Sequence, residues 1–360
     1  MKANPGYKTS MQLILSKLQS LQPFIYYPNP GNIGDCIIAE STYQLFEKNN
    51  IEYTIYNEAS LPESYNLVFG GGGGIVPYWG AIEKIKKILL NSKVNKCILL
   101  PQSIYQADDF IEKLDARFTV FCRENKTFNY VKSINPNVEC ILSHDMAFYL
   151  ERPKFEDYQF NTPNKLIRIA IRLISRFFSL LQNRAEELRY YQRWNAGFRE
   201  KLLNRQLNNV HSLNNNHRFS FNLREDMEKK FTLRPLASFD ISLSWEGQFL
   251  DRKIVRLVSS CFFDALELCD IIITDRLHVG IVALHLNKTV LWLDNSYGKI
   301  FEIYMHSLRH NKNANFIKSI DEIPTEYTNF FISTNESQID TKPANKLSLL
   351  TRILNFIKNT

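Results

Sequence analysis

The chain has 360 residues, of which 44% are hydrophobic and 22% are charged. This composition is typical of a folded globular protein, excludes a disordered or fibrous one, and allows two domains with separate cores. The formal net charge of +7 suits an anionic small molecule, an anionic membrane surface or a nucleic acid. Because no RNA-binding, zinc-finger or recognition-helix motif occurs, we do not expect a nucleic acid partner.

The sequence contains no recognisable targeting or membrane-spanning segment. Its first residues lack the apolar core of a signal peptide, and no uncharged apolar run reaches about 18 residues. The six cysteines lack the two-residue gap typical of zinc and redox sites, so we expect free, buried thiols and no metal. These features make the cytoplasm the expected compartment.

Short apolar strands alternate with helices through the first half of the chain. The strands are expected at residues 24–27, 51–56, 65–69, 96–100, 118–122 and 138–142. The helices are expected at residues 9–21, 36–48, 80–92, 108–114 and 124–133. This alternation predicts a parallel sheet covered on both faces, in an N-terminal Rossmann-like domain at 1–155.

A second, shorter alternation follows, with helices at 252–268 and 278–286 and strands at 270–274 and 289–293. It predicts a C-terminal Rossmann-like domain at 236–335, followed by a tail and helix at 336–360. The predicted fold is therefore α/β, with two doubly wound Rossmann-like domains facing a cleft. Open α/β sheets bind ligands beyond the carboxyl ends of their strands, so we expect the site there.

A basic amphipathic insert or linker is predicted between the domains, at 156–235. Within 166–181, Arg168, Arg172 and Arg176 recur every four residues on an otherwise apolar helix. Such a helix suits peripheral contact with the inner face of the plasma membrane. It equally suits packing against the cleft or against another chain, and the sequence leaves these alternatives open.

The segment Gly31-Asn32-Ile33-Gly34-Asp35 occupies a strand-to-helix turn. Glycines at such a turn let the backbone approach a ligand closely, and the helix N-terminus favours an anion. Asp35 is either the N-terminal capping residue of the helix or a base that accepts a proton from a sugar hydroxyl.

Five consecutive glycines, at 70–74, follow the strand at 65–69. Such a run predicts a nest of backbone amides for an anion, contributed here by Gly71, Gly72 and Gly73. It matches neither the P-loop nor the dinucleotide-binding pattern. Tyr78 and Trp79 follow, and their rings either stack on a sugar or pack in the core.

Asp275, Arg276 and His278 lie where an apolar strand ends and a helix begins. Positive charge there is unfavourable because it adds to the positive end of the helix dipole, and an anionic ligand relieves that penalty. The guanidinium of Arg276 matches a carboxylate or phosphate, and His278 is suited to proton transfer near neutral pH. We therefore predict a binding role for Arg276 and a catalytic role for His278.

These motifs, in this order, resemble those of the polysaccharide pyruvyltransferases of bacterial capsule and exopolysaccharide synthesis. The matching segments cover about 30–305 and are Gly31-Asn32-Ile33-Gly34-Asp35, Gly71-Gly72-Gly73-Gly74, Pro101-Gln102-Ser103-Ile104-Tyr105, Arg123-Glu124, His144-Asp145-Met146-Ala147, Arg224-x-Asp226-x-Glu228, Asp275-Arg276-Leu277-His278 and Asp294-Asn295-Ser296-Tyr297-Gly298-Lys299. The chain departs from a typical member at 160–220, which affects the identity of the acceptor more than the donor chemistry.

The resemblance implies a two-domain fold like that of the GT-B glycosyltransferases, phosphoenolpyruvate as donor and no cofactor. Pyruvate would be transferred to a surface polysaccharide, or to its precursor, as a ketal. The acceptor glycan is either lipid-linked or not. The implied roles are donor binding by Arg276, Arg224, the glycines and Lys299, catalysis by His278, Asp35 and Asp145, and acceptor contacts by Asn32, Tyr78, Trp79 and Gln102.

Two other functions remain compatible with the sequence. One is a glycosyltransferase of the GT-B type that uses a nucleotide sugar, since a fold alone does not fix a reaction. The other is a non-catalytic scaffold in glycan assembly, anchored through 166–181.

Overall fold

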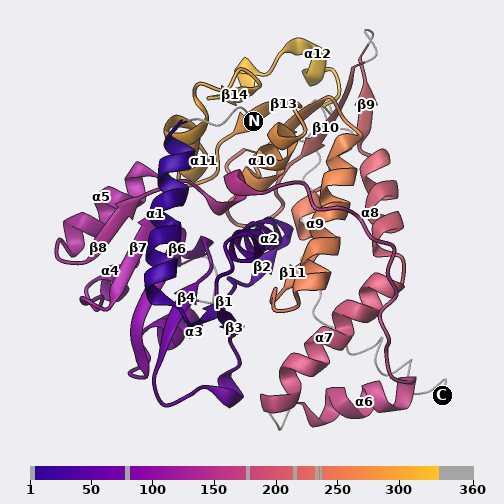
Figure 1. Cartoon of the computed structure of the whole chain (residues 1–360). Helices are drawn as coiled ribbons and strands as arrows, with labels where there is room; N and C mark the ends of the chain where they lie inside the picture. The colour runs from indigo at the N-terminus through magenta and orange to yellow at the C-terminus, as the bar shows by residue number, and fades with distance from the viewer. Residues whose placement is uncertain are drawn as a thin grey trace, which may run out of the picture.

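The computed structural model describes residues 5–77, 82–175, 179–213, 217–231, 235 and 237–331. These residues form two main β-sheets and a short two-stranded ribbon, with helices around and between them (Figure 1). Parallel strands predominate in both main sheets. The architecture is therefore mixed α/β, and the expected Rossmann-like class is confirmed.

The first sheet contains the strands that the sequence predicted in the first half. Its strands are parallel and lie in the order β3-β1-β4-β6-β7-β8, with β5 paired to β6. They are β1 (Phe24–Tyr27), β3 (Tyr53–Ile55), β4 (Tyr65–Phe69), β5 (Gly72–Ile75), β6 (Val94–Ile104), β7 (Phe118–Cys122) and β8 (Glu139–Leu142). Since β1 connects outward to β3 and the chain then returns to β4, the carboxyl ends of β1 and β4 form a topological switch point.

Helices cover this sheet and connect its strands. They are α1 (Pro5–Leu21), α2 (Ile33–Lys48), η1 (Glu58–Ser60), α3 (Ile82–Leu89), α4 (Asp108–Ile111), α5 (Asn125–Ile134) and η2 (Met146–Tyr149). The helix predicted at 36–48 begins three residues earlier, because the side chain of Asn32 caps the backbone N–H of Gly34.

The second sheet has the order β14-β13-β12-β10-β9, and only β9 is antiparallel to its neighbour. Its strands are β9 (Val210–Ser212), β10 (Arg218–Asn222), β12 (Ile271–Thr274), β13 (Thr289–Leu293) and β14 (Ala314–Ile317). The helical segments that follow β10 are η3 (Ile241–Ser244), α9 (Arg252–Glu267), α10 (Leu277–His285), α11 (Lys299–Ile303), η4 (Tyr304–Leu308), η5 (Ile320–Glu322) and α12 (Thr325–Thr328). Since β9 and β10 fall within the predicted linker at 156–235, the second sheet starts earlier than residue 236.

Three helices occupy most of the predicted insert. They are α6 (Lys165–Ile174), α7 (Ser179–Asn195) and α8 (Phe198–Leu207). Arg168 is half-buried, and its guanidinium donates to the Pro163 carbonyl over 3.1 Å. The side chain of Arg172, all of Arg176 and the predicted C-terminal helix lie outside the described residues.

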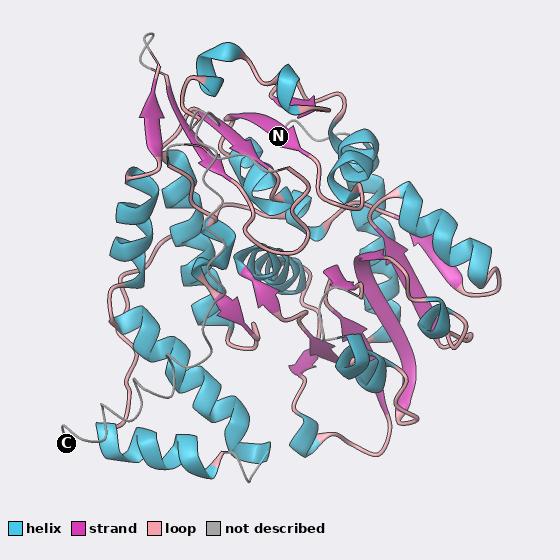
Figure 2. Ribbon diagram, turned by 180° about the vertical axis from the view of Figure 1, so that it is seen from behind, coloured by secondary structure: helices cyan, strands magenta, loops and turns pink. Residues whose placement is uncertain are grey.

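Helix α2 runs between the two sheets, as the front and rear views both show (Figures 1 and 2). By connectivity it belongs to the first sheet, since it joins β1 to β3. It nevertheless packs on α9 and α10 of the second half, and Ile37, Ile38 and Phe46 share one apolar cluster with Val258 and Ile281. This shared core fixes the N-terminus of α2 relative to α10.

A two-stranded antiparallel ribbon also joins the halves. It consists of β2 (Gly31–Asn32) and β11 (Glu246–Gly247), with Gly31 opposite Gly247 and Asn32 opposite Glu246. The ribbon places the turn after β1 against the segment that precedes α9.

His144 lies in a buried contact between α1 and η4. Its Nδ1 atom is 2.8 Å from the Ser307 hydroxyl, and its ring stacks on His306 at a centroid distance of 4.5 Å. Tyr7 meets the same ring edge-on at 4.5 Å. Burial, reinforced by His306, lowers the pKa of His144 to about 3.

Because the folded protein keeps His144 neutral, the free energy of unfolding should fall as the pH becomes acidic. Because the folded-state pKa lies below the ordinary value, this contribution is complete above about pH 6.5 and is lost as the pH falls toward about 3. We expect His144→Asn to reduce the slope of the free energy of unfolding against pH in acid, measured by urea unfolding, by up to about 1.4 kcal/mol per pH unit. Equal acid slopes for the two proteins would contradict the assignment, and His310→Asn, at an exposed position, serves as the control.

Candidate active site

A cavity of about 600 Å³ opens at the switch point of the first sheet. Its walls come from both halves of the chain: the turn after β1, strand β5, the start of α2, the segments after β10, and the start of α10. It is the predicted location, beyond the carboxyl ends of parallel strands. The lining residues are Asn29, Pro30, Gly31, Asn32, Asp35, Gly73, Gly74, Ile85, Arg123, Glu186, Arg224, Asp226, Glu228, Ser242, Leu243, Glu246, Gly247, Gln248, Arg276, Leu277, His278 and Lys299.

The start of α2 supplies Asn32 and Asp35, which cap each other. The Asn32 side chain accepts from the Gly34 N–H over 2.7 Å, and Asp35 Oδ2 accepts from the Asn32 N–H over 3.0 Å. Burial raises the pKa of Asp35, and His278 partly opposes the shift. The N-cap is thus Asn32 and not Asp35, which is the N3 residue of a capping box and also faces the cavity.

Two glycines, which carry no side chain, leave room for His278 and Asp35 beside the start of α2. A Cβ at Gly34 would lie 2.4 Å from His278 Nδ1, and a Cβ at Gly31 would lie 2.0 Å from Asp35 Oδ2. Both distances are far below a van der Waals contact. These two glycines are therefore required by the packing of His278 and Asp35.

A buried ion pair lies behind His278. Arg123 Nη1 contacts Asp145 Oδ2 at 2.5 Å, and both side chains are at most 1% exposed. The same Asp145 oxygen is 3.4 Å from His278 Nε2. Burial would raise the pKa of Asp145, but His278 and Arg123 together hold it below its ordinary value. Asp145 therefore remains an anion that orients the imidazole.

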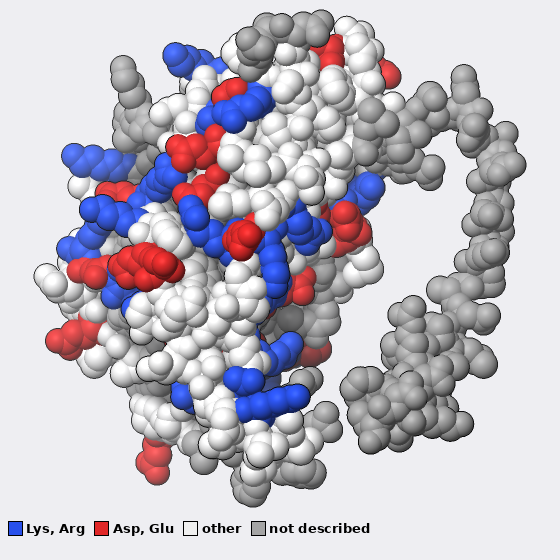
Figure 3. All heavy atoms as spheres, turned by 90° about the vertical axis from the view of Figure 1, so that its right-hand side faces the viewer, with Lys and Arg blue, Asp and Glu red and all other residues white. Residues whose placement is uncertain are grey.

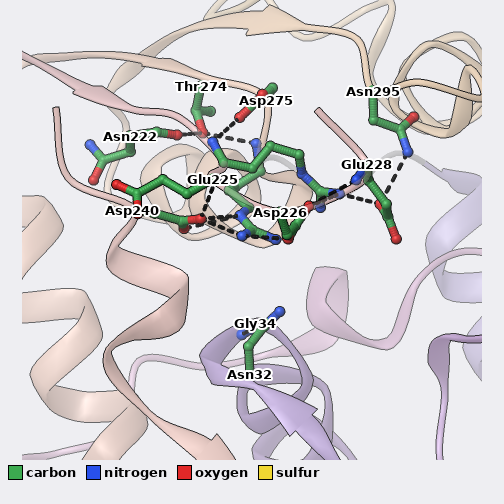
Figure 4. A network of polar contacts seen from close by, with 12 residues as sticks. Asn32, Gly34, Asn222, Glu225, Asp226, Glu228, Asp240, Thr274, Asp275 and Asn295 are labelled. Carbon is green, nitrogen blue, oxygen red and sulfur yellow. Dashed lines mark hydrogen bonds and ion pairs between the residues drawn. The ribbon is translucent and has the colours of Figure 1, made fainter. Parts of the chain in front are cut away.

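Arg276 caps the start of α10 and is buried, at 3% exposure. Its Nε donates to Asp240 Oδ1 over 3.0 Å, and its Nη2 contacts both Asp240 and Asp226, the latter at 2.7 Å. The anion that we expected to offset the helix dipole is thus supplied by the chain itself. Figure 4 shows Asp226 and Asp240 gathered on one side of the site, opposite Asn32 and Gly34.

Glu228 connects the remaining cations. Its carboxylate accepts from Arg224 Nη1, from Lys299 Nζ over 3.0 Å and from Asn295 Nδ2 over 3.1 Å. The Nε atom of Arg224 is buried and makes no hydrogen bond within the described part of the chain. A ligand oxygen that reaches this wall would find a donor already desolvated.

The cavity is not simply cationic. Four Arg or Lys side chains line it, against five Asp or Glu side chains, namely Arg123, Arg224, Arg276, Lys299, Asp35, Glu186, Asp226, Glu228 and Glu246. An anionic ligand must compete with carboxylates that already pair with the cations. Binding therefore depends on geometry more than on net charge.

The structure brings together most of the predicted site residues, but not all. Gly71, Gly72, Gln102 and Asp145 do not line the cavity. The amide of Gln102 donates to the Gly70 carbonyl over 2.5 Å and is fully buried, so it supports the glycine turn from behind. Tyr78 and Trp79 lie outside the described residues.

Sequence reasoning assigned no role to several side chains that the structure places in the site. Arg123 directly follows β7, so the strand-end rule was the signal that could have identified it. Asp240 and Glu186 have no such signal, because they reach the site only through tertiary packing from loop and helix positions.

Comparison with known proteins adds a family relation to this geometry. The family model described as "Polysaccharide pyruvyl transferase" matches residues 32–297, well over half of the chain. The chain belongs to the polysaccharide pyruvyl transferase family. The matched range contains the start of α2, the glycines after β4, Arg224 and the start of α10, so the resemblance indicated by the motifs is confirmed.

Two relatives of this polysaccharide pyruvyl transferase family member extend the comparison. One is the Bacillus subtilis (strain 168) protein named "Putative pyruvyl transferase EpsO", which is 27% identical over 314 residues. That match covers 81% of this chain and 87% of the relative. The other is the crystal structure of a functional uncharacterized protein from Klebsiella pneumoniae subsp. pneumoniae NTUH-K2044, with a TM-score of 0.63 and 27% identity. It covers 88% of this chain and 100% of that one.

The buried pair behind His278 yields a stability prediction. Asp145→Ala leaves the Arg123 charge buried without its partner, so we expect the free energy of unfolding to fall by about 3–5 kcal/mol. Urea unfolding measures the change. The matched control is Asp109→Ala, which breaks the exposed 2.7 Å pair with Lys86 and should cost less than about 1 kcal/mol. Equal losses of unfolding free energy in the two variants would show that the buried pair matters no more to stability than the exposed one.

Proposed function

We propose that the protein transfers pyruvate from phosphoenolpyruvate to two hydroxyls of a surface-polysaccharide sugar, or of its precursor, forming a ketal. One observation carries the proposal. His278 and Asp35 face the same cavity as Arg224, Arg276 and Lys299, in a chain of the pyruvyl transferase family. In this proposal the two sheets act as the lobes of a GT-B-like arrangement around the cavity.

The donor carries a carboxylate and a phosphate, which need separate sets of donors. The wall formed by Arg224, Arg276 and Lys299 offers guanidinium and ammonium groups. Strand β5 at Gly73 and Gly74 offers a backbone without side chains, and a Cβ at Gly73 would lie 3.0 Å from Arg123 and 3.5 Å from Lys299. This arrangement lets an anionic oxygen come close to both cations.

The reaction balances without a cofactor. One sugar hydroxyl bonds to the central carbon of phosphoenolpyruvate while the terminal methylene takes up a proton and becomes a methyl group. The bond from the central carbon to the phosphate oxygen then breaks, and the second hydroxyl bonds in its place. The two hydroxyl protons are released, and in the overall balance one appears on the methyl carbon and one on inorganic phosphate.

Two side chains are placed for the proton transfers. His278, oriented through Nε2 by Asp145, protonates the donor or its departing phosphate. Asp35 accepts the proton of the attacking hydroxyl, and its raised pKa makes it a stronger base than an ordinary carboxylate. Asp145 is a positioning residue because it is fully buried, does not line the cavity, and acts through His278 and Arg123, which do.

The assay is release of inorganic phosphate from phosphoenolpyruvate in the presence of candidate lipid-linked or free sugars. We expect His278→Ala and Arg276→Ala to lower the rate by at least about 100-fold, because each removes a group used in the transition state. Nucleotide release from a sugar donor, without phosphate release, would instead identify a glycosyltransferase.

His310→Ala and Arg218→Ala are the matched controls, since both side chains are exposed and neither lines the cavity. Circular dichroism and thermal unfolding verify that all four variants fold. Turnover near that of the parent in either site variant would remove the proposed mechanism. The absence of turnover in the parent with every sugar tested, of either donor type, would favour a non-catalytic scaffold.

We also propose that α6 contacts an anionic membrane surface on the cytoplasmic side, where a lipid-linked acceptor would be found. None of the described helices has the length and apolar character needed to cross a membrane. On α6, however, five large apolar side chains are exposed, from Leu166 at 77% to Ile174 at 44%. Figure 3 views the molecule from the right-hand side of Figure 1. It shows Lys and Arg side chains toward its lower end, which is the end where α6 lies in Figure 1. Apolar and basic groups together suit an anionic interface.

Vesicle flotation tests this contact. The parent should float with phosphatidylglycerol vesicles and much less with phosphatidylcholine vesicles. Leu166→Glu combined with Leu173→Glu should abolish flotation, because charge replaces two inserted apolar groups. Leu13→Glu, at a position 44% exposed on α1, is the control and should float like the parent. A parent that does not float with either vesicle would contradict the contact.

A further inference from the structure

A second cavity, of about 530 Å³, lies next to the candidate active site. It is lined by Ile55, Tyr56, Asn57, Arg184, Glu186, Glu187, Tyr190, Gln248, Leu250 and Asp251. Glu186 and Gln248 line both cavities, so the two spaces meet at these side chains. The contribution from α7 comes from 160–220, the stretch that we expected to depart from a typical family member.

The junction between the cavities is built by close packing at Gly247. The Tyr190 hydroxyl accepts from the Gln248 N–H over 2.8 Å and donates to Glu186. A Cβ at Gly247 would lie 1.7 Å from that hydroxyl, and the backbone there has φ = +157°. Only glycine therefore lets α7 come close enough for Glu186 to reach both spaces.

The chemistry of this second cavity is that of a neutral polyhydroxyl ligand. Three carboxylates line it, on Glu186, Glu187 and Asp251, against the single arginine Arg184, which pairs with Glu187. Phosphates are disfavoured by this balance, so neither a nucleotide nor a second phosphoenolpyruvate suits it. Carboxylates, the amides of Asn57 and Gln248, and the two tyrosines supply hydrogen-bond partners and apolar ring edges for sugar hydroxyls and ring faces.

We propose that this cavity is an extended acceptor subsite, which holds the neutral saccharide units adjoining the sugar that receives pyruvate. The inference rests on the proposed function, because the reacting sugar must sit in the neighbouring cavity beside Asp35 and His278. Glu186 and Gln248 would contact the linkage between the reacting unit and the next. The α7 segment is then a specificity element for the acceptor.

The probe is the host's own surface polysaccharide, freed of acid-labile ketals and cut into fragments of one to four sugars. Phosphate release from phosphoenolpyruvate gives the KM for each fragment, and calorimetry gives binding without the donor. For the parent, we expect fragments of three or four sugars to bind about tenfold more tightly than one sugar, equivalent to about 1.4 kcal/mol.

Leu250→Trp and Asn57→Trp each place a bulky ring in the cavity, from segments far apart in the sequence, and both side chains are half-buried. Each should remove the length dependence by raising the KM of the longer fragments about tenfold, while the KM for phosphoenolpyruvate stays that of the parent. Leu13→Trp, on the exposed side of α1, is the matched control and should change neither value. Two variants are used so that a folding defect in one of them does not decide the outcome.

The outcomes separate the two proposals. Phosphate release that is independent of fragment length, or a length dependence that survives both tryptophan variants, overturns the subsite and leaves the pyruvyl transfer intact. The absence of phosphate release with every fragment contradicts the pyruvyl transfer. In that case, length-dependent binding that both variants abolish would still identify a saccharide site, and its absence would overturn that too.

Discussion

The site depends on the close approach of two helix N-termini that belong to different sheets. Helix α2 starts at Ile33 and α10 at Leu277, and the imidazole of His278 packs against Gly34 where no Cβ exists. The approach is held by the apolar core that α2 shares with α9 and α10, and not by the polar groups themselves. Burial of that core supplies the free energy that keeps charged residues at their positions.

The second constraint is electrostatic. Arg276, Arg224 and Lys299 are each paired with carboxylates of the chain, through Asp240, Asp226 and Glu228. This pairing keeps guanidinium groups buried and oriented without a ligand, since an unpaired buried charge is costly. An incoming anion shares these cations and meets repulsion from the same carboxylates. Selectivity then follows from shape, because only a ligand that reaches N–H groups not already used by the carboxylates gains more than it loses.

The sequence predicted much of the fold and of the site, and the predictions that failed did so for physical reasons. The strands Phe24–Tyr27, Phe118–Cys122 and Thr289–Leu293 match their predicted bounds, because continuous apolar runs specify buried parallel strands. Strand β10 (Arg218–Asn222) was missed, since it is short, alternates with polar residues and follows an Asn-rich stretch. In the site, residues at strand ends were predicted except Arg123, whereas Asp240 and Glu186 could not be, because long-range packing alone brings them there.

The Gly31–Gly247 pair in the ribbon determines how closely two side chains, one from each half of the chain, can approach the backbone. Gly31 leaves room for the Asp35 carboxyl on one side, and Gly247 leaves room for the Tyr190 hydroxyl on the other. Between the Asp35 carboxyl and the Tyr190 hydroxyl the ribbon therefore consists of main chain alone at this pair. A methyl group added at Gly31 would collide with Asp35, and one added at Gly247 would collide with Tyr190, so the ribbon fixes the positions of both side chains.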